Sequence, residues 1–204
     1  VTKLEVENGE VRVIYANDNS HLNEESSTLA SQKWWRDEDE PEDFNMWFRP
    51  CNLDDPEERE QLLYYGRELY KNAYKGRVPF EPEEFLKTSR EYQAQDPHAV
   101  QFALTRKRIY GLLRMDFSYQ RFPGCGQIRT ICVHPDGRGH GFAPQLLGEA
   151  TSRFRQKGCN SFCANVANGN DRAMKFYNKF GFEEAGRIEG HTIMRKDITV
   201  DSIL

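Results

Sequence analysis

The sequence has no long hydrophobic run, no paired cysteine motif and no continuous apolar stretch at its beginning. None of its 204 residues lies in a run of about 18 apolar residues, which a membrane-spanning helix requires. Residues 1–7 alternate between apolar and charged side chains, whereas a secretory signal is continuously apolar in its middle. With 38% hydrophobic residues and a mean hydropathy of -0.80, we expect a cytoplasmic protein with no membrane span and no export signal.

The cysteines are too scattered to predict a metal site or a disulfide framework. No Cys-x-x-Cys pair occurs, and no histidine lies at the spacing that zinc ligands need. We therefore expect no bound metal, and free thiols as in a reducing compartment at Cys51, Cys125, Cys132, Cys159 and Cys163.

Charge is distributed unevenly, although the net charge is only -4. Residues 1–60 hold 17 acidic and 6 basic residues, a net of -11, which leaves 15 acidic and 22 basic residues, a net of +7, for 61–204. A basic body attracts polyanions such as a phosphate-bearing cofactor, while an acidic segment either attracts a cationic substrate or stays solvated. Because no motif interleaves basic and aromatic residues, we expect no nucleic-acid partner.

The first 43 residues predict an extension that precedes the main domain. Two alternating stretches within 4–15 flank Asn8-Gly9, the dipeptide most typical of a hairpin turn. Residues 17–43 hold few apolar residues and end in an acidic run, which is typical of a solvated linker. We expect a hairpin and an acidic linker over 1–43, and one domain over 44–204.

From residue 44 onward, strand and helix patterns alternate. A helix is predicted from Asp55, whose side chain, with the following proline and acidic residues, is typical of a helix N-terminus, to about residue 74. Further helices are predicted from about 81 and over about 142–157 and 170–179. Strands are predicted at about 44–51, 99–106, 109–119, 127–133 and 160–167, with two more within about 184–198. This order predicts one mixed α/β domain.

Residues 133–147 combine the end of a strand, a glycine-rich turn and the start of an amphipathic helix. Glycines allow a tight turn and a close backbone approach, and a helix N-terminus attracts anions. The spacing is neither the Walker pattern nor the dinucleotide pattern, since Gly139-His140-Gly141 is followed by Phe142-Ala143-Pro144. Taken alone, the stretch predicts either a pyrophosphate cradle or merely a tight turn.

Two motifs in this part of the chain resemble those of the GNAT N-acetyltransferase superfamily. Residues 138–143, RGHGFA, are similar to the family's Arg/Gln-x-x-Gly-x-Gly/Ala acyl-CoA motif. Residues 170–182, NDRAMKFYNKFGF, are similar to its Asn-x-x-Ala-x-x-Phe-Tyr-x-x-x-Gly-Phe segment. The resemblance covers about residues 44–198. It implies a GNAT-like α/β fold, with a central, mostly antiparallel mixed sheet of about seven strands and about four helices.

The resemblance also implies where the acyl donor, acetyl-CoA, binds. Backbone groups of Ile131 and Val133, with Cys132 between them, are expected to pair with the pantetheine arm as an added strand does. Asn170 is expected to bind the same arm. Tyr177 is expected to protonate the departing thiolate as general acid, the alternative being an aromatic packing residue. The pyrophosphate is expected at Arg138, Gly139, His140, Gly141, Phe142, Ala143 and Pro144.

The sequence leaves the general base open. Family members that use a glutamate have it at positions that are Gln127, Arg129 and Asn165 here, none of which accepts a proton. Other candidates, each also compatible with a structural role, are Asp116, His134 and His191. A base acting through water, or an amine that is already partly deprotonated, would also serve.

The implied activity is transfer of an acetyl or other short acyl group from acyl-CoA to a primary amine by direct attack. The alternative is an acyl-CoA-binding sensor or assembly module without turnover. An acyl-enzyme at Cys132 is disfavoured, because side chains alternate along a strand. The partner is expected to be a small-molecule or protein amine, and a homodimer is compatible with the sequence. The acceptor is expected beside residues 184–195 and Tyr64, Tyr65, Tyr70 and Tyr74.

Overall fold

A computed structural model describes residues 3–7, 10–15, 45–105, 108–119 and 121–199, in two units, Val1–Glu42 and Asp43–Leu204. In the first unit, β1 (Lys3–Glu7) pairs antiparallel with β2 (Glu10–Tyr15). This pairing confirms the predicted hairpin. The turn dipeptide and the predicted linker over 17–43 lie outside the described residues.

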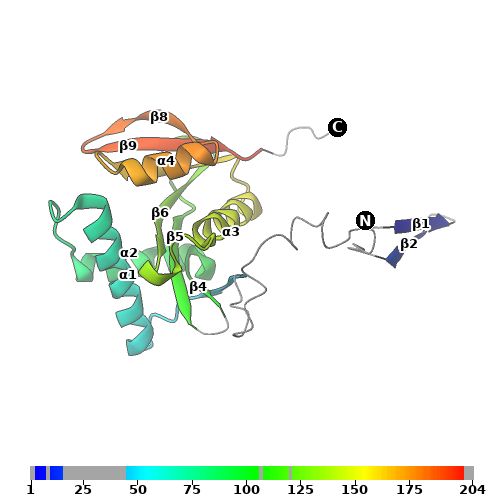
Figure 1. Cartoon of the computed structure of the whole chain (residues 1–204), viewed down its shortest axis with the longest axis horizontal. Coiled ribbons are helices and arrows are strands. Elements are labelled where there is room, and N and C mark those ends of the chain that lie inside the picture. The colour runs from blue at the N-terminus through cyan, green and yellow to red at the C-terminus, as the bar shows by residue number, and fades with distance from the viewer. Residues whose placement is uncertain (1–2, 8–9, 16–44, 106–107, 120, 200–204) are drawn as a thin grey trace, which may run out of the picture. The chain divides into compact units, whose positions relative to one another are not determined.

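A seven-stranded mixed sheet forms the centre of the second unit (Figure 1). Its strand order is β3-β4-β5-β6-β7-β9-β8, and all neighbours are antiparallel except β6 and β7. The described part also contains four α-helices, so the predicted fold class is confirmed. The strands are β3 (Trp47–Pro50), β4 (Val100–Leu104), β5 (Ile109–Asp116), β6 (Cys125–Val133), β7 (Ser161–Ala167), β8 (Glu183–Ile188) and β9 (His191–Asp197).

Helices α1 (Pro56–Tyr74) and α2 (Pro82–Gln95) lie between β3 and β4 in the chain. The side chain of Asp55 accepts a hydrogen bond of 2.8 Å from the N–H of Glu57, as a helix cap does. The left-handed conformation of Lys75 (φ 52°) ends α1. The predicted limits of this helix are therefore confirmed.

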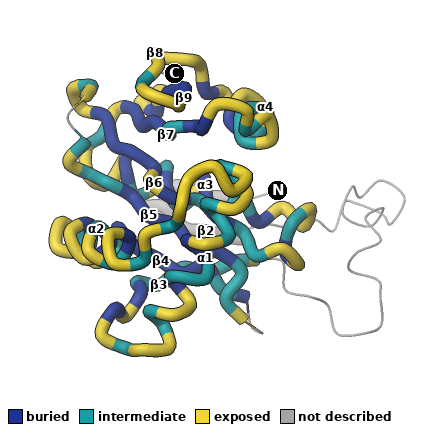
Figure 2. Tube along the Cα trace, turned by 90° about the vertical axis from the view of Figure 1, so that its left-hand side faces the viewer, coloured by how far each residue is buried: buried dark blue, intermediate teal, exposed yellow. Residues whose placement is uncertain are grey.

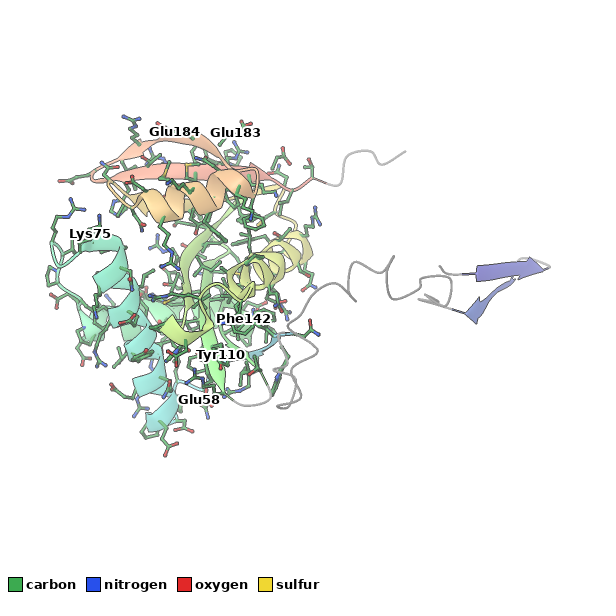
Figure 3. All side chains as sticks on the ribbon, in the orientation of Figure 1. Glu58, Lys75, Tyr110, Phe142, Glu183 and Glu184 are labelled. Atoms are coloured by element: carbon green, nitrogen blue, oxygen red, sulfur yellow. The ribbon has the colours of Figure 1, made fainter. Side chains whose placement is uncertain are left out.

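Helix α3 (Phe142–Gln156) packs directly on β6. Its buried stripe is the one that the 3.6-residue periodicity predicts: Phe142, Leu146, Leu147, Ala150 and Phe154. The two elements are so close that a Cβ added at Gly126 would lie 2.2 Å from the ring of Phe154. The rings of Phe142 and Tyr110, on β5, lie 5.1 Å apart at the other end of the helix (Figure 3). Both ends of α3 are thus anchored to the sheet, and its N-terminus is placed beside the end of β6.

The helices cover both faces of the sheet. Leu62 of α1 and Phe85 of α2 pack in one core with Leu112 of β5. The next residue of β5, Leu113, faces the opposite core with α3 and α4 (Asp171–Lys179). Figure 2 shows buried central strands and helices whose outer sides are exposed.

The parallel strands β6 and β7 pair over only part of their length. Cys125–Ile128 lie opposite Ser161–Ala164, and beyond these residues the two strands are not paired. At this point Arg129 is an extra residue in β6, because Thr130 lies opposite Arg114 and Ile128 lies opposite Met115. Such a bulge bends its strand and increases the local twist. The sheet therefore opens between β6 and β7 near its middle.

None of the described helices is both long enough and apolar enough to span a bilayer. The described side chains also form no group of three or more His, Cys, Asp or Glu residues that could hold a metal ion.

Candidate functional site

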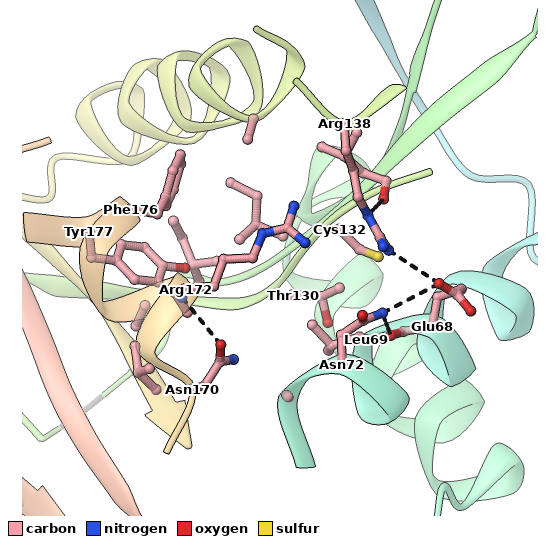
Figure 4. A pocket seen from close by; sticks show the side chains of 18 of the residues that line it. Glu68, Leu69, Asn72, Thr130, Cys132, Arg138, Asn170, Arg172, Phe176 and Tyr177 are labelled. Atoms are coloured by element: carbon pink, nitrogen blue, oxygen red, sulfur yellow. Dashed lines mark hydrogen bonds and ion pairs between the residues drawn. The ribbon is translucent and has the colours of Figure 1, made fainter. Parts of the chain in front are cut away.

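A cavity of about 440 Å³ lies where β6 and β7 separate (Figure 4). Residues 128–133 of β6 and 164–167 of β7 line its middle. The last turns of α1 line it from one face of the sheet, and α4 and the start of α3 line it from the other face. The cavity is therefore accessible to groups from both faces. It collects all the predicted donor-binding residues except His140, which is exposed and does not line it.

The backbone of β6 presents an open edge to this cavity. The N–H of His134 bonds to the carbonyl oxygen of Tyr110 on β5 at 2.8 Å. Because hydrogen-bonding direction alternates along a strand, the backbone groups of Ile131 and Val133 point away from β5, toward the side where β7 has departed. Their side chains pack with the α3 side of the core, whereas that of Cys132 packs with the α1 side. An extended polar ligand can pair with this edge as an additional strand does.

The glycine-rich turn lies at one end of the same edge. Gly139 (φ 90°) and Gly141 (φ 78°) adopt left-handed conformations, which glycine tolerates and other residues rarely do. A Cβ at either position would have no described heavy atom within 4 Å, so the space beside the turn is open. Gly141 precedes α3, and no side chain forms a capping bond there. The first N–H groups of α3 therefore form the kind of site that binds anions.

Phe142 lines this end of the cavity with little more than its backbone. Its side chain is only 4% exposed and packs between Gly137 and Tyr110. The ring thus fixes the start of α3, while Ala143 and Pro144 line the cavity next to it.

Arg138 bridges the two faces of the sheet (Figure 4). Its Nη2 lies 3.2 Å from Oε2 of Glu68 on α1, and its Nε donates to the carbonyl oxygen of Val133 at 3.4 Å. Glu68 also accepts from Nδ2 of Asn72 at 3.3 Å. Glu68 and Asn72 were not predicted as site residues, because they are about 70 positions from the turn and belong to neither motif.

Tyr177 lies on α4 with its ring packed against Phe176 and Phe182 at centroid distances of 5.3 and 4.9 Å. The residue is 5% exposed, and its hydroxyl has no hydrogen-bond partner among the described residues. Figure 4 shows the hydroxyl directed into the cavity. Burial raises the pKa of Tyr177 above its ordinary value near 10. The phenol is therefore a proton donor at neutral pH.

Asn170 forms the N-cap of α4, where its Oδ1 accepts a bond of 3.2 Å from the N–H of Ala173. Its Nδ2 has no acceptor among the described residues and is available to a ligand.

None of the three candidate bases lines the cavity, and two of them are held by contacts elsewhere. Asp116 accepts bonds from the N–H and the hydroxyl of Ser118 at 3.0 and 2.9 Å. His134 stacks on Tyr64 and lies 3.6 Å from Asp136. These contacts give both residues structural roles.

His191 is connected to the cavity through Tyr74. Its Nδ1 lies 2.8 Å from the carbonyl oxygen of Glu189, an acceptor, so Nδ1 carries the proton. Its Nε2 then accepts from the hydroxyl of Tyr74, 2.9 Å away. Of the four tyrosines expected near the acceptor, only Tyr74 lines the cavity. Tyr65, for example, is buried and donates to the carbonyl oxygen of Ile109 at 3.0 Å.

The charge of the cavity lining is mostly positive. Among the described residues that line it, the one acidic residue, Glu68, is paired with Arg138. The other charged residues that line it are Arg129, Arg172 and Lys179. Because Oδ1 of Asn165 on β7 is also buried there without a partner, the lining has both the charge and the unpaired polar groups to bind a phosphate-bearing ligand with amides.

Comparison with known proteins bears on the family and the fold. A family model described as the acetyltransferase (GNAT) family matches residues 22–182. The PaiA N-acetyltransferase of Thermoplasma acidophilum, solved in complex with coenzyme A, is 20% identical with a TM-score of 0.58, and the match covers 75% of this chain and 99% of that one. An N-acetyltransferase from Staphylococcus aureus Mu50 is 20% identical with a TM-score of 0.59, over 76% of this chain and 99% of that one. A GNAT-family acetyltransferase from the same organism is 12% identical with a TM-score of 0.61, over 76% and 100%. At these identities, the structures show a shared fold.

Proposed function

Because the chain belongs to the acetyltransferase (GNAT) family, we propose that it transfers the acetyl group of acetyl-CoA to a primary amine in the cavity between β6 and β7. One observation carries this proposal: an open strand edge, an anion-binding turn and the hydroxyl of a buried tyrosine meet in the same cavity. When bound, acetyl-CoA supplies an acetyl group activated as a thioester, which an amine attacks directly without a covalent enzyme intermediate.

The donor is held at three places. Backbone groups of Ile131 and Val133 pair with the amides of the pantetheine arm, and Nδ2 of Asn170 adds a hydrogen bond. The turn at residues 138–144 and the first N–H groups of α3 bind the pyrophosphate. Arg138 adds a charge-assisted contact, for which it exchanges part of its bonding to Glu68.

Proton transfers at the reacting end fall to two tyrosines. Tyr177 gives the proton of its hydroxyl to the departing thiolate, and its raised pKa keeps that proton in place before the step. Tyr74 takes the proton of the attacking amine on its hydroxyl oxygen while its own proton passes to Nε2 of His191. A backbone N–H of β6 polarises the oxygen of the carbonyl that is attacked.

A binding module without turnover is the second candidate. It is favoured by the absence of a carboxylate at Gln127, Arg129 and Asn165, the positions that supply the base in relatives that use a glutamate. In that case the cavity would bind acyl-CoA, and the tyrosines would only pack.

Replacement of Tyr177 by Phe separates the two candidates. For an enzyme, we expect thiol release from acetyl-CoA over a panel of amines to fall about 10²-fold or more, since a general acid typically contributes that much. The affinity for coenzyme A, measured by calorimetry, should stay within a few fold, because the hydroxyl acts on the leaving group. Tyr119→Phe removes a hydroxyl outside the cavity and should leave turnover unchanged. Absence of thiol release in the unmodified protein, with coenzyme A bound, would favour the binding module.

A further inference from the structure

An arginine on the acceptor side of the cavity is held in place by neutral groups. Arg129, the extra residue of the β6 bulge, lines the cavity. Its Nε donates to the hydroxyl of Tyr92 on α2, and its Nη1 donates to Oε1 of Gln127, both at 2.6 Å. Tyr92 and Gln127 are only 6% and 1% exposed, so two buried side chains hold the guanidinium in place. No described carboxylate pairs with it, and its Nη2 has no described partner.

The next residue presents an unpaired hydroxyl to the same cavity. Thr130 is 2% exposed, and its Oγ1 has no hydrogen-bond partner among the described residues. Leaving a buried hydroxyl unpaired is costly, so buried groups of this kind nearly always have a partner. Because Thr130 lines the cavity, a bound ligand can supply that partner.

A second, buried arginine reinforces the positive charge. Arg114 lies opposite Thr130 on β5 and is 4% exposed. It contacts the ring of Phe85 and the hydroxyl of Thr88, with no described carboxylate partner, and its Nε is unpaired. Burial lowers the pKa of Arg114 to about 10, and the charge of Arg129 also lowers it. Because this pKa is still well above 7, Arg114 remains a cation at neutral pH. Two guanidinium groups without a described carboxylate partner therefore lie on this side of the sheet, that of Arg129 exposed and that of Arg114 buried.

The donor has a phosphate site of its own in this cavity. Its phosphates are assigned to the turn at residues 138–144, at one end of the β6 edge, while Arg129 and Thr130 lie at the other end. In the proposed reaction, that end is where the acetyl group meets the acceptor, and Arg129 contacts α2 there through Tyr92. An anion bound there therefore belongs to the acceptor.

We propose that the acceptor amine carries a carboxylate, and that Arg129 and Thr130 bind this carboxylate at the α2 side of the cavity. A planar carboxylate matches the donors of a guanidinium, and the Thr130 hydroxyl donates to the same group. The substrate class is thus a free amino acid or a related aminocarboxylate. This inference rests on the proposed acetyl transfer for its chemistry, but its binding test does not require turnover.

The test is calorimetric titration of the full chain saturated with coenzyme A. The probes are amino acids of increasing chain length, from glycine and β-alanine upward, each compared with its own carboxamide. We expect at least one carboxylate to bind about tenfold or more tightly than its carboxamide, as a charge-assisted pair provides. Arg129→Gln should abolish that preference without changing the affinity for coenzyme A. Thr130→Val keeps the shape of the side chain. It should lower the affinity for the carboxylate several-fold and leave the affinity for the carboxamide unchanged.

Arg187→Gln is the matched control, because Arg187 is paired with Glu184 on β8 and does not line the cavity. It should retain the preference. Equal binding of carboxylates and carboxamides, an unchanged preference in Arg129→Gln, or no binding by any carboxylate would overturn this inference. If coenzyme A still binds in those cases, the proposed acetyl transfer stands. If coenzyme A does not bind, the proposed function itself fails.

Discussion

The side chains of successive residues of β6 face opposite sides of the sheet, and this difference determines their chemistry. Ile131 packs toward α3, whereas the thiol of Cys132 is buried toward α1. Burial raises the pKa of Cys132 to about 12, so the nucleophilic thiolate is nearly absent at neutral pH. A cysteine next to the expected thioester is thus kept from reacting by its position on the strand.

Cys132→Ala should therefore retain turnover within a few fold. Because burial holds the pKa of the thiol far above pH 8, the thiolate is nearly absent there. We expect iodoacetamide to leave Cys132 unmodified at pH 8 in the folded protein, as read by peptide mass spectrometry. A loss of turnover in Cys132→Ala with coenzyme A affinity unchanged would instead indicate an acyl-enzyme.

Tyr74 and His191 should behave as one unit. Both His191→Gln and Tyr74→Phe are expected to lower kcat by about 10-fold or more, and the double variant should be no slower than the slower single variant. Steady-state rates of the four proteins measure this coupling. Additive losses in the double variant would contradict the relay and leave only a structural role.

At the scale of elements, the turn before α3 contributes both to the stability of the fold and to donor binding. Gly141 and Gly158 adopt nearly the same left-handed conformation, at φ 78° and 75°, and a Cβ at either would meet no described atom within 4 Å. Gly141 begins α3 inside the cavity, while Gly158 follows the end of α3 outside it.

Alanine at either glycine should lower the free energy of unfolding by about 1–2 kcal/mol, the usual cost of the left-handed conformation. Only Gly141→Ala should also weaken coenzyme A, by about tenfold, because its methyl group projects into the space that we assign to the pyrophosphate. Thermal unfolding and calorimetry on both variants separate the two effects. Similar coenzyme A affinities in the two variants would contradict this assignment.

Several elements could be predicted from local signals. The capping side chain of Asp55 and the apolar stripe of α3 are local properties, and both are observed as predicted. The residue at which β6 and β7 separate could not be predicted from local signals, because the bulge at Arg129 depends on register with β5. The strands predicted at about 44–51 and 109–119 are longer than β3 and β5, because the alternation of apolar and polar residues continues beyond the paired residues.

At the scale of the whole molecule, the sequence motifs predicted one wall of the cavity. The resemblance of two motifs to a known family implied donor contacts within residues 131–144 and 170–177, and all of the named contacts except His140 line the cavity. The other wall is made by α1, and the pairing of Glu68 with Arg138 depends on how the chain folds back. The roles of Arg129 and Thr130 were also missed, since an unpaired buried group is visible only after burial is known.

We propose that residues 43–204 form a self-sufficient acyltransferase domain. All the described residues that line the cavity lie between Glu68 and Phe180, and this unit has its own cores on both faces of the sheet. Deletion of residues 1–42 should leave coenzyme A affinity unchanged by calorimetry. The Michaelis constant for an aminocarboxylate, and its salt dependence, should also be unchanged. A salt dependence that disappears on deletion would instead show that the acidic segment attracts a cationic amine.

The crystal structure of the full chain with coenzyme A tests the central claim most directly. We predict that the pantetheine arm pairs with the backbone of Ile131 and Val133, that the pyrophosphate contacts the turn before α3, and that the sulfur lies within hydrogen-bond reach of the Tyr177 hydroxyl. Coenzyme A bound elsewhere, or bound in the cavity with its sulfur turned away from Tyr177, would contradict the proposed site and the role of this tyrosine.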